Sequence, residues 1–173
     1  QALAVLLWSL LIFVILFEIT MPWIMFGFAP GFATNPEKFD LAVLLSRITF
    51  PYLLFISLVS LMSGLLNSLG RFAAAAATPI LLNVCLIGAI LWLVNFTSTP
   101  AHALAFGVTL AGAIQLFWLL FHVGRTGIKL RLRIARFTAP IRTMLWRIMP
   151  AAVGAGVYQI SLLVDTVIAS LLP

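Results

Sequence analysis

The stretch ALAVLLWSLLIFVILFEITMPWIMFGF, residues 2–28, decides the fold, because Glu18 is its only charged residue. A helix needs about 20 apolar residues to cross roughly 30 Å of hydrocarbon, and this run is longer. Four more long apolar runs follow, at residues 41–69, 72–96, 101–123 and 148–172. Continuous runs indicate helices, since the strands of a transmembrane barrel would alternate apolar and polar residues. The sequence therefore predicts an all-α, polytopic transmembrane bundle with five spans.

The composition excludes a soluble globular domain. Apolar residues make up 64% of the chain and charged residues 8%, whereas soluble domains have about 45–50% and about 25%. The one cysteine, Cys85, lies in an apolar run and allows neither an intrachain disulfide nor a cysteine-based metal site. The chain begins at Gln1 without a basic region before the first apolar run, so we expect an internal piece of a longer protein.

The basic residues predict the orientation in the membrane. The net charge is +6. Most basic residues lie in the two connectors that share one side, namely Arg71, Arg125, Lys129, Arg131, Arg133, Arg136, Arg142 and Arg147. The opposite connectors, 29–40 and 95–100, carry only Lys38. The positive-inside rule places the first side in the cytoplasm, with the residue 1 end cytoplasmic and the residue 173 end outside. This asymmetry favours topology or contact with anionic lipid over binding of nucleic acid.

The basic connector, residues 124–147, carries apolar residues at helical spacing. These are Ile134, Phe137, Ile141, Leu145 and, just beyond the connector, Ile148. They predict a short amphipathic helix at the inner leaflet, which Pro140 should kink or split. The candidates for contact with anionic lipid are Lys129, Arg131, Arg133 and Arg136. The alternatives are a role in topology and anchoring alone, or attraction of a substrate phosphate.

Small and polar residues recur at helical spacing in three spans. In the second span the candidates for a cavity wall are Ser57, Ser60, Gly64 and Asn67, which form one stripe that ends at Arg71. Such a stripe either faces water or lets another helix approach closely. The fifth span repeats the pattern with Gly154, Tyr158, Ser161, Asp165 and Ala169. The fourth span carries a weaker polar row of Gly107, Ala111 and Gln115.

Charges inside the spans need a physical reason, because each costs at least about 2.5–3.5 kcal/mol at mid-span. The three cases are Glu18, Arg47 and Asp165. No Lys or Arg lies within one helical turn of Asp165 along its own helix. Its partner must be a group on another helix, water, or a bound cation, so Asp165 is a candidate site for Na⁺ or a proton. The alternatives are a structural ion pair or hydrogen bond between helices, or exposure of Asp165 at the outer interface.

The sequence shows no catalytic pattern and predicts no enzyme. It contains no glycine-rich phosphate loop, no nucleophile with a local base, and no metal-ligand spacing. We therefore expect no cofactor, and no metal other than a candidate Na⁺ at Asp165. An intramembrane enzyme whose catalytic groups lie outside this sequence stays an alternative.

Several sequence motifs resemble one transporter family. They are RITFPYLLFIS at residues 47–57, GLLNSLGRF at 64–72, PILLN at 79–83 and PAAVGAGVYQISLLVDTVIAS at 150–170. In combination they are similar to the MurJ (MviN) family of lipid II flippases. That family belongs to the multidrug/oligosaccharidyl-lipid/polysaccharide exporter superfamily. The resemblance covers nearly the whole chain and agrees with the five predicted spans.

The resemblance implies a carrier of two six-helix lobes that works by alternating access. Residues 1–123 would be the last four helices of the first lobe, 124–147 a cytoplasmic linker, and 148–173 the first helix of the second lobe. The implied substrate is the undecaprenyl-pyrophosphate-linked peptidoglycan precursor, moved across the bacterial inner membrane. The family's cavity arginines lie mainly on its first, second and eighth helices, outside this chain. The alternatives are a drug or polysaccharide exporter of the same superfamily, or a non-transporting membrane scaffold.

Overall fold

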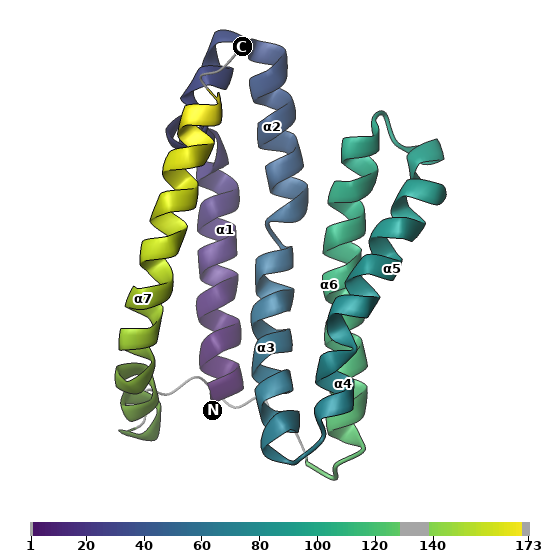
Figure 1. Cartoon of the computed structure of the whole chain (residues 1–173), viewed down its shortest axis with the longest axis vertical. Coiled ribbons are helices and arrows are strands. Elements are labelled where there is room, and N and C mark those ends of the chain that lie inside the picture. The colour runs from purple at the N-terminus through teal and green to yellow at the C-terminus, as the bar shows by residue number, and fades with distance from the viewer. Residues whose placement is uncertain (1, 129–138, 171–173) are drawn as a thin grey trace.

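The computed structural model describes residues 2–128 and 139–170, which form a bundle of long helices (Figure 1). The helices are α1 (Ala2–Phe28), α2 (Pro36–Thr49), α3 (Tyr52–Ser68), α4 (Phe72–Ala76), α5 (Thr78–Leu91), α6 (Pro100–Gly124) and α7 (Ala139–Ser170). Two 3₁₀ turns, η1 (Pro30–Thr34) and η2 (Leu93–Phe96), follow α1 and α5. Five segments are long and apolar enough to cross a membrane, which confirms the predicted five-span, all-α fold.

Proline residues interrupt two of the spans. The helices α2 and α3 together form one span, 36–68, with a turn at Phe50 and Pro51. The helices α4 and α5 form another span, 72–91, with a turn at Ala77, two residues before Pro79. A proline has no backbone N–H and so removes one bond from the helical hydrogen-bond ladder. Both breaks therefore bring backbone carbonyls within reach of side chains on neighbouring helices.

The helix α6 lies at the centre of the packing. It contacts α2, α3, α4 and α5, while α1 packs against α2 and α3. A buried apolar cluster joins α3, α4 and α6, with the members Val59, Met62, Leu66, Ala74, Leu119 and Val123. The helix α7 lies alongside α1 and contacts η1 near its C-terminal end (Figure 1).

The helix that contains the fifth span begins before the apolar run. The helix α7 starts at Ala139 and continues past Pro150, so the described end of the predicted linker is helical and continuous with the span. The kink or split predicted at Pro140 involves residues before Ala139, which the structure does not describe. The predicted lipid-contact residues of the linker lie outside the described residues, since 129–138 are not among them.

Candidate functional site

The predicted stripe on α3 is an open surface in the part of the chain that the structure describes. Ser57 is half-buried, and its hydroxyl donates to the backbone oxygen of Leu53 at 2.7 Å. Ser60, Gly64 and Asn67 are exposed. No described atom outside the helix backbone lies within 4 Å of a Cβ placed on Gly64. At Gly64, therefore, no described helix packs closely against the stripe.

The polar face of α7 is also open. Ser161 and Asp165 are both exposed. Within residues 2–128 and 139–170, the side chain of Asp165 makes no hydrogen bond and no ion pair. No cluster of three or more His, Cys, Asp or Glu side chains gathers around it or elsewhere in these ranges. The carboxylate therefore keeps its oxygens available for a ligand or for residues outside the described part.

The other two charged residues of the spans lie together. The Nε of Arg47 on α2 donates to the backbone oxygen of Glu18 on α1 at 3.2 Å. The Oε1 of Glu18 is buried and has no hydrogen-bond partner among the described residues. Arg47 thus connects α1 to α2 close to a carboxylate, whereas Asp165 has no such neighbour.

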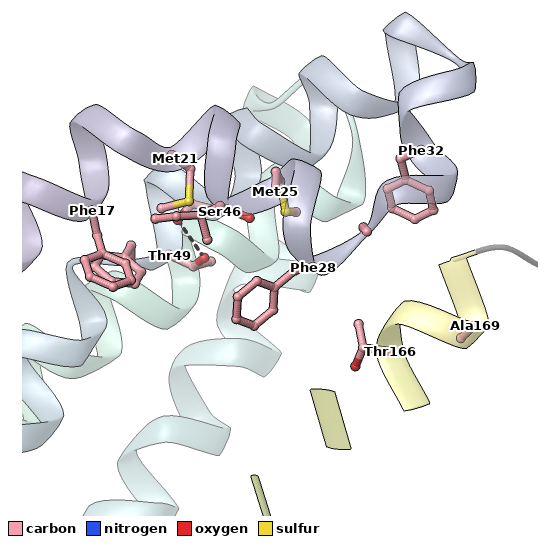
Figure 2. Close-up of a pocket in the computed structure, with 12 residues that line it drawn as sticks. Phe17, Met21, Met25, Phe28, Phe32, Ser46, Thr49, Thr166 and Ala169 are labelled. Atoms are coloured by element: carbon pink, nitrogen blue, oxygen red, sulfur yellow. Dashed lines mark hydrogen bonds between the residues drawn. The ribbon is translucent and has the colours of Figure 1, made fainter. Parts of the chain in front are cut away.

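An apolar cavity of about 510 Å³ lies where α7 meets α1, η1 and α2 (Figure 2). Its lining residues are Phe17, Met21, Ile24, Met25, Phe28, Ala29, Phe32, Ser46, Thr49, Phe50, Thr166 and Ala169. The hydroxyl of Thr166 donates to Leu162 at 2.8 Å, and that of Thr49 donates to Leu45 at 3.0 Å, so each is bonded within its own helix. The cavity can accept an apolar chain but offers little to orient a polar group.

Three side chains of α6 donate to backbone carbonyls beside the proline breaks. The Thr109 hydroxyl donates to the oxygen of Ile48 at 2.5 Å. The Gln115 Nε2 donates to the oxygen of Thr78 at 2.7 Å, and the Trp118 indole N–H donates to Ala74 at 3.1 Å. These bonds hold the interrupted spans against α6. Because Gln115 is buried, the bond from its Nε2 lies in a low-dielectric interior, whereas its Oε1 is buried without a hydrogen-bond partner among the described residues.

Two glycines of α6 allow its neighbours to approach closely. A Cβ placed on Gly107 would lie 2.7 Å from the Cβ of Ala89. A Cβ placed on Gly112 would lie 2.7 Å from Cδ2 of Tyr52 and 2.8 Å from Cβ of Phe55. In the sequence, only the weak polar row of Gly107, Ala111 and Gln115 indicated that this face of α6 packs against other helices. Sequence reasoning did not identify Thr109, Gly112 or Trp118, since their partners are distant in the chain.

Comparison with known proteins places the whole chain beside one family. The family model described as lipid II flippase MurJ matches residues 1–173. A probable lipid II flippase MurJ of Rhizobium tropici is 42% identical over 168 residues, which cover 93% of this chain and 31% of the relative. The corresponding protein of Rhizobium meliloti (strain 1021) is 40% identical over 175 residues, covering 98% of this chain and 32% of the relative.

A lipid II flippase MurJ of Burkholderia cenocepacia is 34% identical over 176 residues, which cover 96% of this chain and 33% of the relative. The chain thus spans about a third of the length of the curated relatives that it matches.

Proposed function

The chain belongs to the MurJ family of lipid II flippases, and from that premise we propose that the protein carries lipid II across the bacterial inner membrane by alternating access. The observation that carries this proposal is the match of the family model to all of residues 1–173. The substrate would be the undecaprenyl-pyrophosphate-linked peptidoglycan precursor. Movement between leaflets changes no covalent bond, so the protein would be a transporter and not an enzyme.

The test is flipping by the complete protein in reconstituted vesicles. Fluorescent lipid II is placed in one leaflet, and its arrival in the other is followed with a membrane-impermeant quencher. We expect transfer that depends on the protein and is absent for a polyprenyl phosphate sugar without the peptide. Equal transfer of unrelated drugs or of polysaccharide-linked lipids would instead favour another exporter of the superfamily. No transfer of any lipid would favour a membrane scaffold.

Within this carrier we assign residues 1–123 to the last four helices of the first lobe, 124–147 to the cytoplasmic linker, and 148–173 to the first helix of the second lobe. The packing supports the division. The buried cluster is built from α3, α4 and α6, all within the first assigned unit. Among the described residues, the main contacts of α7 with this unit are those with α1 and η1.

The orientation follows from charge. We assign the connector at Arg71 and the segment 124–147 to the cytoplasm, which puts the residue 1 end inside and the residue 173 end outside. Alkaline phosphatase, which is active only outside the cytoplasm, should give no signal when fused after Thr126 and a strong signal when fused after Asn35. The opposite pattern would reverse the topology.

Asp165 is our candidate for the coupling site. Its carboxylate is exposed and has no partner among the described residues, which supports binding of Na⁺ or uptake of a proton. Either event changes the charge on α7 and could shift the balance between inward-open and outward-open states. Asp165→Asn should abolish the response of flipping to an imposed Na⁺ or proton gradient. Asp40→Asn, at an exposed acid of α2, is the matched control and should keep that response.

The stripe Ser57, Ser60, Gly64 and Asn67, together with Ser161 of α7, is our candidate for the cavity wall. Exposure of Gly64, with nothing packed on it, supports this assignment. Gly64→Leu should reduce flipping while the protein still folds, because the new side chain would occupy the lumen. Gly27→Leu on α1, also at an open position, is the control. Normal flipping by Gly64→Leu would place that face in lipid.

The linker residues Lys129, Arg131, Arg133 and Arg136 are our candidates for contact with anionic lipid of the inner leaflet. Each basic residue near such a surface contributes about 1 kcal/mol of attraction, which salt screens. A peptide of residues 124–147 should bind vesicles containing phosphatidylglycerol at low salt and leave them at high salt. Binding that salt does not weaken would mean that the apolar face alone holds the segment.

A further inference from the structure

A second cavity, of about 490 Å³, is lined by residues of α3, α4, the turn between them and the end of α6. These elements meet at the opposite end of the bundle from η1 (Figure 1). Its lining residues are Leu66, Gly70, Arg71, Phe72, Ala73, Ala74, Trp118 and His122. It combines one permanently charged side chain with an apolar and aromatic lining. The site already described does not use it.

Hydrogen bonds fix the walls of this cavity. The Trp118 indole N–H donates to Ala74 at 3.1 Å, which ties α6 to α4. The ring of His122 lies 4.3 Å from that of Trp118, and its Nδ1 is 2.9 Å from the backbone oxygen of Trp118. Because a carbonyl only accepts, this nitrogen carries the hydrogen. The two aromatic walls are therefore held in place without a ligand.

The turn after α3 sets the position of Arg71. Gly70 has φ +73°, a backbone conformation that glycine adopts without steric cost. The turn lets the backbone N–H of Arg71 donate to the oxygen of Leu66 at 2.9 Å. Leu66 is fully buried, so this bond ties Arg71 to the floor of the cavity. The guanidinium group thus starts from a fixed backbone position.

The charge of Arg71 has no protein counter-charge. Its side chain forms no ion pair with any residue in 2–128 or 139–170. The four acidic residues of the chain are Glu18, Glu37, Asp40 and Asp165. They belong to α1, α2 and α7, none of which lines the cavity. An exposed arginine at the end of two membrane spans, beside an indole and an apolar floor, has the composition of an interfacial lipid site.

We propose that this cavity binds one anionic phospholipid. The guanidinium group of Arg71 would bind the phosphate, and the part of an acyl chain nearest the headgroup would pack against Leu66, Phe72 and Trp118. A guanidinium forms paired, charge-assisted hydrogen bonds with phosphate oxygens. The site lies where spans end, at the level of the lipid headgroups. A bilayer phospholipid can therefore place its phosphate there whichever leaflet this end of the bundle faces. The proposal requires that α3 and α6 cross the membrane but does not depend on which substrate the protein carries.

The test is native mass spectrometry of the complete protein in nonionic detergent, titrated with phosphatidylglycerol. Arg71→Ala should weaken the tightest binding event about tenfold, as expected for loss of a charge-assisted contact. Arg125→Ala is the matched control. Arg125 lies over the Phe121 ring, 5.9 Å from its centroid, and does not line the cavity. This variant should bind as the wild type does. Equal losses in both variants would mean diffuse attraction without a site.

A second variant tests the cavity without changing charge. Ala73 is exposed and lines the cavity, so Ala73→Leu should fill part of it and also weaken binding. Wild-type affinity in both Arg71→Ala and Ala73→Leu would overturn the proposal. Size-exclusion profiles identify a variant that fails to fold, and the other variant then decides the outcome.

Two competitors separate the sources of the phosphate group. Inorganic phosphate at about 100-fold excess should not displace phosphatidylglycerol, because a site that also binds the acyl chain should hold free phosphate more than about 100-fold more weakly. Displacement would make this a site for free phosphate. Undecaprenyl pyrophosphate should bind the Arg71→Ala variant as well as it binds the wild type. Loss of its binding in Arg71→Ala would assign the cavity to the transported lipid and overturn the phospholipid assignment.

Discussion

The helices α6 and α7 carry similar sequence patterns but have opposite environments. Both are long apolar spans with small and polar residues at helical spacing. In α6, 33% of the most apolar stretch is buried within the described bundle, and in α7 the share is 0%. The polar side chains of α6 donate to α2, α4 and α5, whereas the Thr166 hydroxyl of α7 donates within its own helix. The Asp165 carboxylate accepts no hydrogen bond from any described residue.

This difference separates two uses of one pattern in a membrane helix. On α6 the small residues admit neighbouring helices, and the polar side chains donate to backbone carbonyls near the proline breaks. On α7 the same kind of row makes no such contact, so its polar groups remain available for ligands or for other parts of the protein. A polar residue that bonds to a neighbouring helix contributes to packing, and one without a partner among the described residues is a candidate for function. Variants in matched pairs test this distinction.

The largest effect on stability should come from glycines. Gly112→Ala in α6 places a methyl group within 2.8 Å of the Cβ of Phe55, an atom fixed to the backbone of α3. Overpacking of this kind costs about 1–3 kcal/mol. We expect a clearly lower unfolding temperature in detergent, measured by the loss of the monodisperse peak after heating.

Gly154→Ala in α7 is the matched control, because no atom of the described residues lies within 4 Å of its Cβ position. Alanine also has the higher helix propensity, so this variant should be as stable as the wild type or more so. Equal destabilisation by both variants would mean that α7 is packed as tightly as α6 in the complete protein.

The next largest loss of stability should come from replacing a glutamine of α6. Gln115→Leu removes the donor to the carbonyl of Thr78 inside the bundle. Interhelical hydrogen bonds in membranes are worth up to about 1–2 kcal/mol, so stability should fall by about that amount. Gln159→Leu on the exposed face of α7 should change the unfolding temperature little. A neutral Gln115→Leu would show that the carbonyl of Thr78 is satisfied within α5.

A smaller effect is expected from the threonines. Thr109→Val keeps the shape of the side chain but removes the bond to Ile48, which joins α6 to the break before α3. The average interhelical bond of this kind contributes about 0.6 kcal/mol. Thr166→Val removes only a bond within α7 and should be neutral. The same heating assay distinguishes the two, and a larger loss in Thr166→Val would contradict the comparison.

The sequence predicted the five spans because hydrophobic length is a local property. It did not predict the role of α6, because the partners of Thr109 and Gln115 lie 61 and 37 residues away in the chain. Nothing near Gly112 indicates that Tyr52 and Phe55 lie against it. Helix contacts of this kind depend on packing that no single run of residues specifies.

The boundaries of the spans show the same limit. The kink or split expected at Pro140 stays a prediction, because the linker residues 129–138 before it lie outside the described residues. Pro150 lies inside α7 without ending it. For the candidate site, the sequence identified Asp165 as a charge without a local partner, and the described contacts add none. Its role in coupling stays a prediction.

The smallest effect on stability should come from Asp165→Asn. Because Asp165 is exposed and unpaired among the described residues, removing its charge should change stability by no more than about 0.5 kcal/mol. Na⁺ that binds only the folded protein should raise the unfolding temperature of the wild type, and K⁺ at the same ionic strength should not. Asp165→Asn should lose this response while it keeps the wild-type unfolding temperature without Na⁺. If the variant is instead as unstable as Gln115→Leu, then Asp165 has a structural partner outside the described residues, and the contrast between α6 and α7 does not extend to this position.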